Sequence, residues 1–380
     1  MERILRGECF FDDAVFLQRR RLKGPCGNEY NTPMTRICIY PRVESMGGVG
    51  SFRLKFAEGL KSRGIEVSYD LDDPHVDFIL VLAGTKNLLG LYRARKRGIP
   101  IIQRLDGINW VQRKRWTGFR YHLRAEYGNA VLSFIRRFLA DKIVYQSEFT
   151  NQWWEDWYGE TRVPYTVIHN AVDLNVYNPD PRSKDFSPLR ADTNAPDKYR
   201  LLLVEGSLAG GLDSGLRWGV ELAEKLSKVF PIELLVVGRV DEVRKKEILS
   251  KAKADVKFLG VVPREEIPEI DRSAHLYFSA EVNPPCPNAV IEALACGLPV
   301  LGFDTGSLSE LVPPTAGKTV PYGGDQWKLE EPDISALTEA AAKILTNLTP
   351  YRAGARQHAE ENLGLEQMVK KYLIFLTEQE

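Results

Sequence analysis

The sequence predicts an α/β protein built from two consecutive doubly wound domains, each with a parallel sheet. Short apolar runs rich in β-branched residues alternate with segments of helical periodicity along most of the chain. The 380 residues exceed what a single hydrophobic core of ordinary size holds together. The pattern stops once, at a stretch rich in Pro, Asp and Ser over 177–198, and then restarts.

The apolar runs place the expected strands. In the first half they fall at 36–41, 65–70, 77–84, 99–105, 142–147 and 165–169. In the second half they fall at 200–204, 232–238, 256–262, 275–280 and 298–303. Helices are expected after Gly50, with Phe52, Phe56 and Leu60 on one face, and over 213–229.

These elements divide the chain into five parts. The first, 1–33, is a polar, irregular extension, which is either an upstream segment from an early start codon or a real arm. Two domains over 34–178 and 199–360 are joined by a linker at 179–198. The last part, 361–380, holds apolar residues at helical spacing, so we expect an amphipathic helix that docks on a surface.

Composition excludes several classes of protein. Lys and Arg number 51, as do Asp and Glu, so the net charge argues against a general nucleic-acid binder. The five cysteines contain no C-x-x-C pair and the five histidines are scattered, so neither a disulfide framework nor a metal site is predicted. No apolar run is long enough to span a bilayer, and we predict a reducing, cytoplasmic setting.

Two segments favour an anion at the start of a helix. Gly47 and Gly48, between the first strand and first helix, allow close backbone approach, although a tight turn explains them equally well. In the second, Asn288 is expected to cap a helix over 289–296, and Pro287 stops the helix from extending backward, so that free amides near Ala289 face a diphosphate. Glu292, one turn further, can accept hydrogen bonds from ribose hydroxyls. The alternative is a capped surface helix.

The first turn of the second domain is a third candidate. Gly206, Ser207 and Gly210 could cradle a phosphate with backbone amides. A flexible turn with Asp213 as helix cap is the other interpretation.

Two further candidates lie at strand ends. Arg104 and Asp106 end a first-domain strand, where Asp106 could orient an acceptor or simply form an ion pair. Gly306 and Glu310 follow the strand at 298–303, where a ligand turn and an ordinary helix start compete.

The segment 110–137 mixes basic and aromatic residues. It contains seven Arg or Lys residues between Arg113 and Arg137, with Trp110, Trp116, Phe119 and Tyr121 among them. Such a mixture suits an anionic lipid surface or a phosphorylated acceptor. A solvated helix face is the alternative.

Together these motifs resemble the retaining glycosyltransferases of family 4 (glycosyl transferases group 1), which have the GT-B fold of two Rossmann-like domains facing a cleft. The resemblance runs from about Met34 to the last helix and is carried most specifically by 168–173 and 292–300. It implies that Glu292 binds the donor ribose and that amides near Asn288 bind the diphosphate of a nucleotide-sugar. Gly47, Gly48, Gly306 and Glu310 fall where the family has its glycine loop and its Gly-Gly-x-x-Glu turn.

Three departures stand beside this resemblance. The position of a second family glutamate, eight residues before Glu292, is Pro284. The turn at 206–211 lacks the family's Arg and Lys, so a cation such as Arg239 or Arg104 would have to neutralise the diphosphate. The family's catalytic histidine has no clear counterpart near Asp106.

The sequence therefore predicts transfer of a sugar from a nucleotide-diphosphate donor to a saccharide, lipid-linked or small-molecule acceptor, with retention implied by the resemblance. No cofactor or metal is expected, and Asp106 and Arg104 are the candidate catalytic residues. Peripheral contact with the inner face of a membrane through 110–137 is a further expectation. Two alternatives stay open, a catalytically silent binding or regulatory relative and a sugar-nucleotide epimerase of the same fold.

Overall fold

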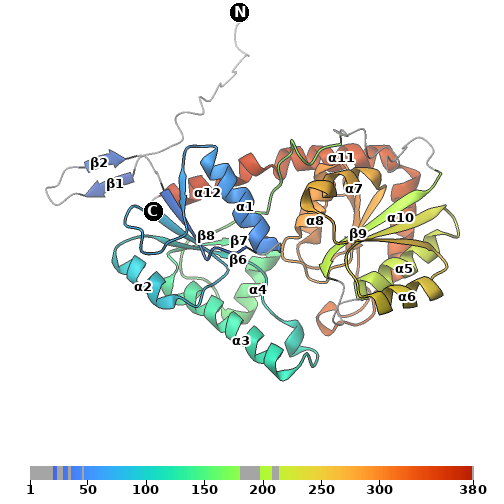
Figure 1. Cartoon of the computed structure of the whole chain (residues 1–380), viewed down its shortest axis with the longest axis horizontal. Coiled ribbons are helices and arrows are strands. Elements are labelled where there is room, and N and C mark those ends of the chain that lie inside the picture. The colour runs from blue at the N-terminus through green and yellow to red at the C-terminus, as the bar shows by residue number, and fades with distance from the viewer. Residues whose placement is uncertain are drawn as a thin grey trace, which may run out of the picture.

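The computed structural model describes residues 20–23, 29–32, 36–44, 47–179, 197–207 and 214–378. Two parallel six-stranded sheets lie one after the other along the long axis of the molecule (Figure 1). The first has the order β4-β3-β5-β6-β7-β8. Its strands are β3 (Arg36–Tyr40), β4 (Glu66–Ser68), β5 (Phe78–Leu82), β6 (Ile101–Leu105), β7 (Lys142–Tyr145) and β8 (Tyr165–Val167).

The second sheet has the order β11-β10-β9-β12-β13-β14, so the direction of winding reverses between β9 and β12. In sheets of this kind ligands bind beyond the carboxyl ends of the strands at such a reversal. The strands are β9 (Tyr199–Ser207), β10 (Ile232–Arg239), β11 (Asp255–Gly260), β12 (Leu276–Ser279), β13 (Val300–Phe303) and β14 (Gly317–Val320).

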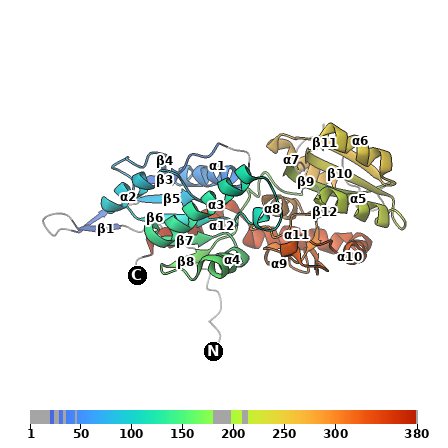
Figure 2. The ribbon, with the colours of Figure 1, turned by 90° about the horizontal axis from the view of Figure 1, so that it is seen from below.

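Helices cover both faces of each sheet, which is why strands such as β5 and β6 are buried at all five positions. The first half contains α1 (Gly48–Lys61), α2 (Leu88–Lys96), α3 (Phe119–Phe134), α4 (Glu148–Tyr158), the 3-10 turn η2 (Val111–Arg113) and the π-helical turn η3 (Ile135–Leu139). Seen from below, the two halves lie side by side (Figure 2).

The second half is richer in helices. They are α5 (Ser214–Leu226), α6 (Glu242–Lys251), α7 (Ile267–Ser273), α8 (Asn288–Ala295), α9 (Leu308–Leu311), α10 (Ile334–Thr346), α11 (Leu348–Asn362) and α12 (Leu365–Thr377), with 3-10 turns η5 (Arg264–Glu266) and η6 (Gln326–Lys328). The helices α5 and α10 pack on one face of the second sheet, and α8 and α11 on the other.

The last helix crosses back to the first domain. Tyr372 of α12 packs against Phe52 and Phe56 of α1, with ring centroids 5.5 and 4.9 Å apart. A Cβ atom on Gly59 would lie 2.6 Å from Cγ2 of Val369, so the two helices approach more closely there than a larger residue would allow. The C-terminal segment forms a helix over Leu365–Thr377, and its apolar face completes the core around α1.

The expected strands all occur, with ends shifted by a few residues; β9 extends three residues beyond its expected end. The helices α2, α4, α6, α7, α10 and α11 and the strand β14 were not predicted by position. Of the extension at 1–33, the structure describes an antiparallel pair, β1 (Arg20–Lys23) and β2 (Glu29–Thr32). Most of the predicted linker, 180–196, lies outside the described residues, and the domain boundaries stay predictions.

Candidate functional site

The glycine loop of the first domain lies against the start of α8 in the second. Gly47 immediately precedes α1, and a Cβ atom on Gly48 would lie 3.8 Å from Asn288 Nδ2. The prediction that Asn288 caps α8 is wrong, because Pro287 holds the extended backbone before the helix and Asn288 is its first residue. No side chain caps α8, so its first amide groups are left for another acceptor.

An ion pair joins the same two helices across the domains. Lys55, on the face of α1 turned toward the second domain, donates from Nζ to Glu292 Oε1 at 3.2 Å. The same ammonium donates to the backbone carbonyl of Ala171 at 2.9 Å. We call this pairing of Lys55 with Glu292 the α1–α8 contact. Burial lowers the pKa of the Lys55 ammonium, and the carboxylate of Glu292 opposes that shift.

Glu292 has a second basic neighbour. Arg264 of η5 places Nη2 3.8 Å from Oε1 of Glu292. The Glu292 side chain is 12% exposed, so it lies almost wholly inside the protein at the point where the domains meet. Two cations thus approach one oxygen of this carboxylate, as is expected for a charge held away from bulk water.

Arg104 and Asp106 form a closed network. Arg104, buried at the end of β6, pairs with Asp106 and donates from Nη2 to Asn170 Oδ1 at 2.6 Å. Gln146 also donates to Asp106. Burial raises the pKa of the Asp106 carboxyl, and the Arg104 guanidinium opposes this. The structure therefore brings the two candidate catalytic residues together, with the charge of Arg104 directed at Asp106.

The turn after β13 is shaped by a close contact. Gly306 has a φ of +61°, and a Cβ atom there would lie 2.4 Å from the backbone nitrogen of Pro284. Ser307 donates its backbone N–H to the Pro284 carbonyl at 2.9 Å. The position at which the resemblance expects a second glutamate is thus filled by a proline whose backbone is held by this turn.

Glu310 reaches the first domain. Its two carboxylate oxygens accept from the backbone N–H groups of Glu148 and Phe149, at 2.8 and 2.7 Å, in the first turn of α4. His169 Nε2 lies 3.3 Å from the same carboxylate. Burial raises the pKa of Glu310, but the hydrogen bonds from His169 and the two amides outweigh it, so the pKa is lowered overall.

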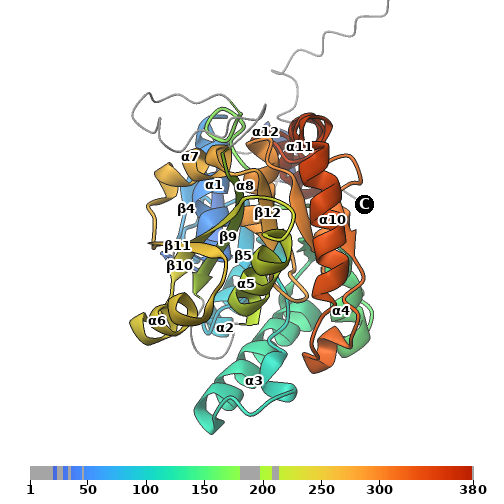
Figure 3. The same ribbon diagram turned by 90° about the vertical axis from the view of Figure 1, so that its right-hand side faces the viewer.

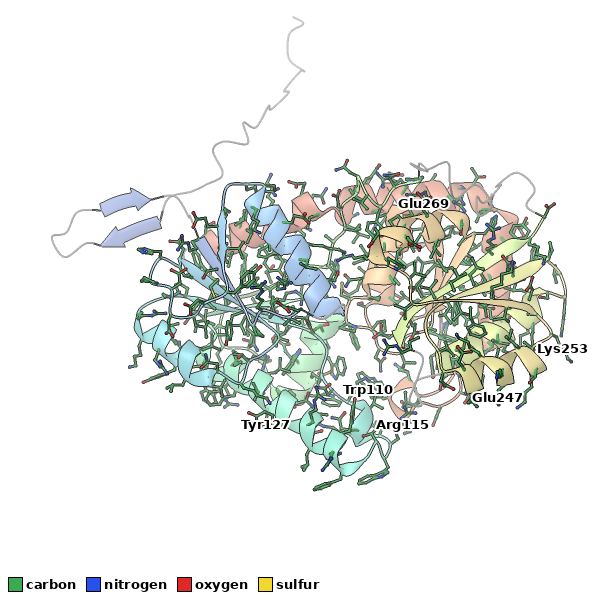
Figure 4. The ribbon with its side chains drawn as sticks, viewed as in Figure 1. Trp110, Arg115, Tyr127, Glu247, Lys253 and Glu269 are labelled. Atoms are coloured by element: carbon green, nitrogen blue, oxygen red, sulfur yellow. The ribbon has the colours of Figure 1, made fainter. Side chains whose placement is uncertain are left out.

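An aromatic contact lies on the same side of the interface. The Trp327 ring of the second domain lies 5.2 Å from Trp110 and 5.2 Å from Trp153, measured between centroids. Phe149 and Trp157 of α4 lie 6.2 Å from it. We call this cluster the α4–Trp327 contact. Figure 4 labels Trp110 on the side of the first domain that faces the second.

The carboxyl end of β9 carries the remaining candidates. Ser207 pairs in register with Arg239 of β10, whose side chain is exposed. A Cβ atom on Gly238 would lie 1.8 Å from the Glu205 carbonyl oxygen, so the two strand ends are in direct contact. For Gly206 and Ser207 only the backbone is described, and Gly210 lies outside the described residues.

Sequence reasoning missed Lys55, Arg264 and Trp327. Lys55 carried one available signal, since it is a lysine within the stretch of α1 that also carries Phe52 and Phe56. Its partner, however, stands 237 residues away, which no local pattern reveals. Within the described part of the chain, no three His, Cys, Asp or Glu side chains are grouped to hold a metal ion.

With this geometry in place, the comparisons with known proteins define the class of fold. Residues 200–347 match the model of the family described as "Glycosyl transferases group 1". One subunit of the phosphatidylinositol N-acetylglucosaminyltransferase of Arabidopsis thaliana is 25% identical over 136 residues, which are 34% of this chain and 28% of that protein. The match therefore spans little more than a quarter of the length of this relative.

Solved structures match nearly the whole chain. Sucrose-phosphate synthase from Thermosynechococcus elongatus superimposes with a TM-score of 0.65 at 17% identity, covering 90% of this chain and 98% of that one. Anabaena Alr3699/HepE in complex with UDP and glucose superimposes with a TM-score of 0.65 at 15% sequence identity, covering 91% of this chain and 100% of that one. WaaG, a glycosyltransferase involved in lipopolysaccharide biosynthesis, has a TM-score of 0.62 at 15% sequence identity, with the same coverage of both chains. This protein has the GT-B fold, with two Rossmann-like domains.

Proposed function

We propose that this protein transfers a sugar from a nucleotide-diphosphate donor to a saccharide, lipid-linked or small-molecule acceptor, with retention of configuration. The observation that carries the proposal is the uncapped start of α8, with Glu292 one turn in and Gly48 opposite. A diphosphate would accept from the helix amides, and ribose hydroxyls would donate to Glu292. The family match over 200–347, which includes α8, supports the same assignment.

The diphosphate also needs a cationic partner. Arg104 is buried against Asp106 and Asn170, which favours Arg239, exposed beside the end of β9, in this role. Gly306 and Glu310 would then act through shape and domain contact rather than by touching the donor, since Glu310 already accepts from α4. Asp106, 22% exposed, remains our candidate for orienting the acceptor hydroxyl.

Ligand-induced stabilisation tests the donor. The melting temperature should rise with one of UDP, GDP, ADP or dTDP, and with the matching nucleotide-sugar, because a ligand that binds the folded state stabilises it. Release of that nucleoside diphosphate in the presence of candidate acceptors should follow, and NMR of the product would report its anomeric configuration. Absence of any shift across the panel would contradict the proposal for donors built on these four nucleotides.

A second candidate, a donor-binding protein without transferase activity, is favoured by one observation. Pro284 stands where the resemblance expects a sugar-binding glutamate, and its backbone is packed against Gly306. Binding without transfer to any acceptor, and without slow hydrolysis of the donor, would favour this alternative.

We further propose that the protein contacts a membrane surface that carries the acceptor. The helix α3 projects from the lower edge of the first domain (Figures 1 and 3), and Figure 4 labels Arg115 and Tyr127 there. Among the described helices none is long and apolar enough to cross a bilayer. Seven large apolar side chains between 116 and 138 are nevertheless exposed, namely Trp116, Phe119, Tyr121, Leu123, Tyr127, Phe134 and Phe138.

Basic residues flank this apolar stripe. Arg120, Arg124 and Arg137 are exposed beside it, so the surface offers both an apolar face and positive charge to an anionic bilayer. Each basic side chain near such a surface is worth about 1 kcal/mol. We therefore assign this surface to the cytoplasmic face of a membrane, with a lipid-linked acceptor within reach.

Vesicle flotation tests the surface. The protein should float with vesicles containing phosphatidylglycerol and not with phosphatidylcholine alone, and added salt should weaken binding. The pair Phe134→Ser and Phe138→Ser should reduce flotation by at least about tenfold. The pair Val243→Ser and Leu249→Ser, at least as exposed on α6, serves as the control and should change nothing. Equal loss in both pairs would contradict a specific surface.

A further inference from the structure

Lys55 is a buried cation that belongs to one domain and pairs with the other. Its Nζ donates to the Ala171 carbonyl at 2.9 Å within the first domain, which fixes the position of the ammonium there. It also donates to Glu292 Oε1 at 3.2 Å in the second domain. The residue is 8% exposed, so water does not substitute for either partner.

The pair exists only while the domains keep their present placement. Moving α8 away from α1 would leave an ammonium in a nearly buried site with one carbonyl as its partner. The pKa of Lys55 agrees with this: burial lowers it, and the nearby carboxylate of Glu292 raises it, so Glu292 favours the charged ammonium. The charge of Lys55 therefore favours the arrangement in which Glu292 stands beside it.

The carboxylate of Glu292 is held by one oxygen only. Both Lys55 and Arg264 approach Oε1, whereas Oε2 accepts no hydrogen bond from any side chain or backbone group that the structure describes. A carboxylate anchored through one oxygen keeps the other available for a hydroxyl in a fixed direction. Two ribose hydroxyls would require just such a directed acceptor.

We infer that Lys55 is a positioning residue for the donor: from the first domain it orients the carboxylate of Glu292 in the second, so that nucleotide binding depends on how the domains are placed. This inference rests on the proposed function of Glu292. Because coupling between two equilibria is reciprocal, a bound nucleotide in turn stabilises the α1–α8 contact.

Three variants test the inference by calorimetry with whichever of UDP, GDP, ADP or dTDP binds. Lys55→Met keeps the length and apolar stem of the side chain and removes its charge. We expect the Kd for the nucleoside diphosphate to rise about tenfold, within the usual range of coupling between sites. Glu292→Gln should weaken binding as well, and adding Lys55→Met to it should cause little further loss, since both changes remove one shared interaction.

Arg53 supplies a matched control on the same helix. It is also 8% exposed, and among the described residues its guanidinium donates to the Val43 carbonyl, at 2.7 Å, and the Tyr69 hydroxyl, at 3.2 Å, both in the first domain. Arg53→Met should lower the melting temperature as much as Lys55→Met does, or more, while leaving the Kd within twofold. If the two variants lower the melting temperature alike but only Lys55→Met raises the Kd, the effect on Kd comes from positioning of Glu292 and not from a general loss of packing in α1.

The outcomes are distinct. If Lys55→Met and Arg53→Met alter the Kd equally, or if the effects of Lys55→Met and Glu292→Gln simply add, Lys55 does not act through Glu292 and the inference is overturned. If Glu292→Gln weakens binding and Lys55→Met does not, the donor site stands without Lys55. If neither variant alters the Kd, Glu292 does not bind the nucleotide and the proposed site itself is wrong.

Discussion

Two of the contacts between the domains have opposite chemistry. The α1–α8 contact depends on one buried ion pair, Lys55 with Glu292, whose partners come from different domains. The α4–Trp327 contact buries aromatic rings, and Glu310 adds its carboxylate to the start of α4 nearby. Burial of apolar area is non-directional and tolerates small shifts, whereas a buried ion pair loses its benefit when either charge is displaced.

Because of this difference, we expect the two contacts to have different roles. The α4–Trp327 contact is suited to holding the domains together whether or not a ligand is bound. The α1–α8 contact is suited to responding, because a ligand that bonds Glu292 acts on the same carboxylate that Lys55 holds. Under the proposed function, one side of the interface would provide stability and the other would provide sensitivity to the donor.

The largest loss of stability is expected from a substitution that breaks the α1–α8 contact. Glu292→Ala leaves the Lys55 ammonium buried without its counter-charge, and loss of one partner of such a pair costs about 3 kcal/mol. Urea unfolding monitored by tryptophan fluorescence measures this. The matched variant Glu292→Gln keeps an acceptor and should lose less. Equal, small losses in both would show that the pair contributes little to the interface.

The next largest loss of stability is expected from a substitution that breaks the α4–Trp327 contact. Trp327→Ala removes a half-buried ring from four aromatic neighbours, and we expect a loss of roughly 2–3 kcal/mol, below the value for a fully buried tryptophan. Nucleoside diphosphate affinity should change less than in Lys55→Met. Calorimetric unfolding in two separate steps would show that the domains had become uncoupled. A larger effect on affinity than that of Lys55→Met would reverse the assignment of the two contacts.

The smallest effect concerns Glu310 and pH. Because its pKa is lowered in the folded state, Glu310 stabilises the fold above its ordinary pKa, and this contribution disappears as pH falls through the lowered folded value. Glu310→Gln should therefore cost about 1 kcal/mol near neutral pH. The difference from the parent protein should shrink as the carboxyl becomes protonated in acid. A difference independent of pH would mean that charge is unimportant at this helix start.

The sequence predicted the sheets well and the interface poorly, for a physical reason. Runs such as β5 are apolar on both faces, so composition alone marks them as buried strands. Glu310, by contrast, was predicted as a donor ligand, and the structure places it at the start of α4, 161 residues earlier in the chain. Contacts between domains depend on how two folded surfaces meet, and local periodicity carries no information about that.

The same limit explains the cap of α8. The side chain of Asn288 suits a cap, but Pro287 fixes the extended backbone one residue earlier and the helix starts at Asn288. Glu292 was correctly placed one turn into this helix, while its pairing with Lys55 was invisible. Side-chain type and helical spacing are readable from sequence; the partner of a buried charge often is not.

The return of α12 to the first domain has a consequence for synthesis on the ribosome. Part of the core around Phe52 and Phe56 is supplied by α12, which lies beyond the whole second domain in chain order. At 5–20 residues per second, the nascent first domain must wait roughly 10–40 s for that helix after its own strands have emerged. During this interval the part of α1 that packs on α12 lacks its cover, so the second domain can finish folding before the core of the first is complete.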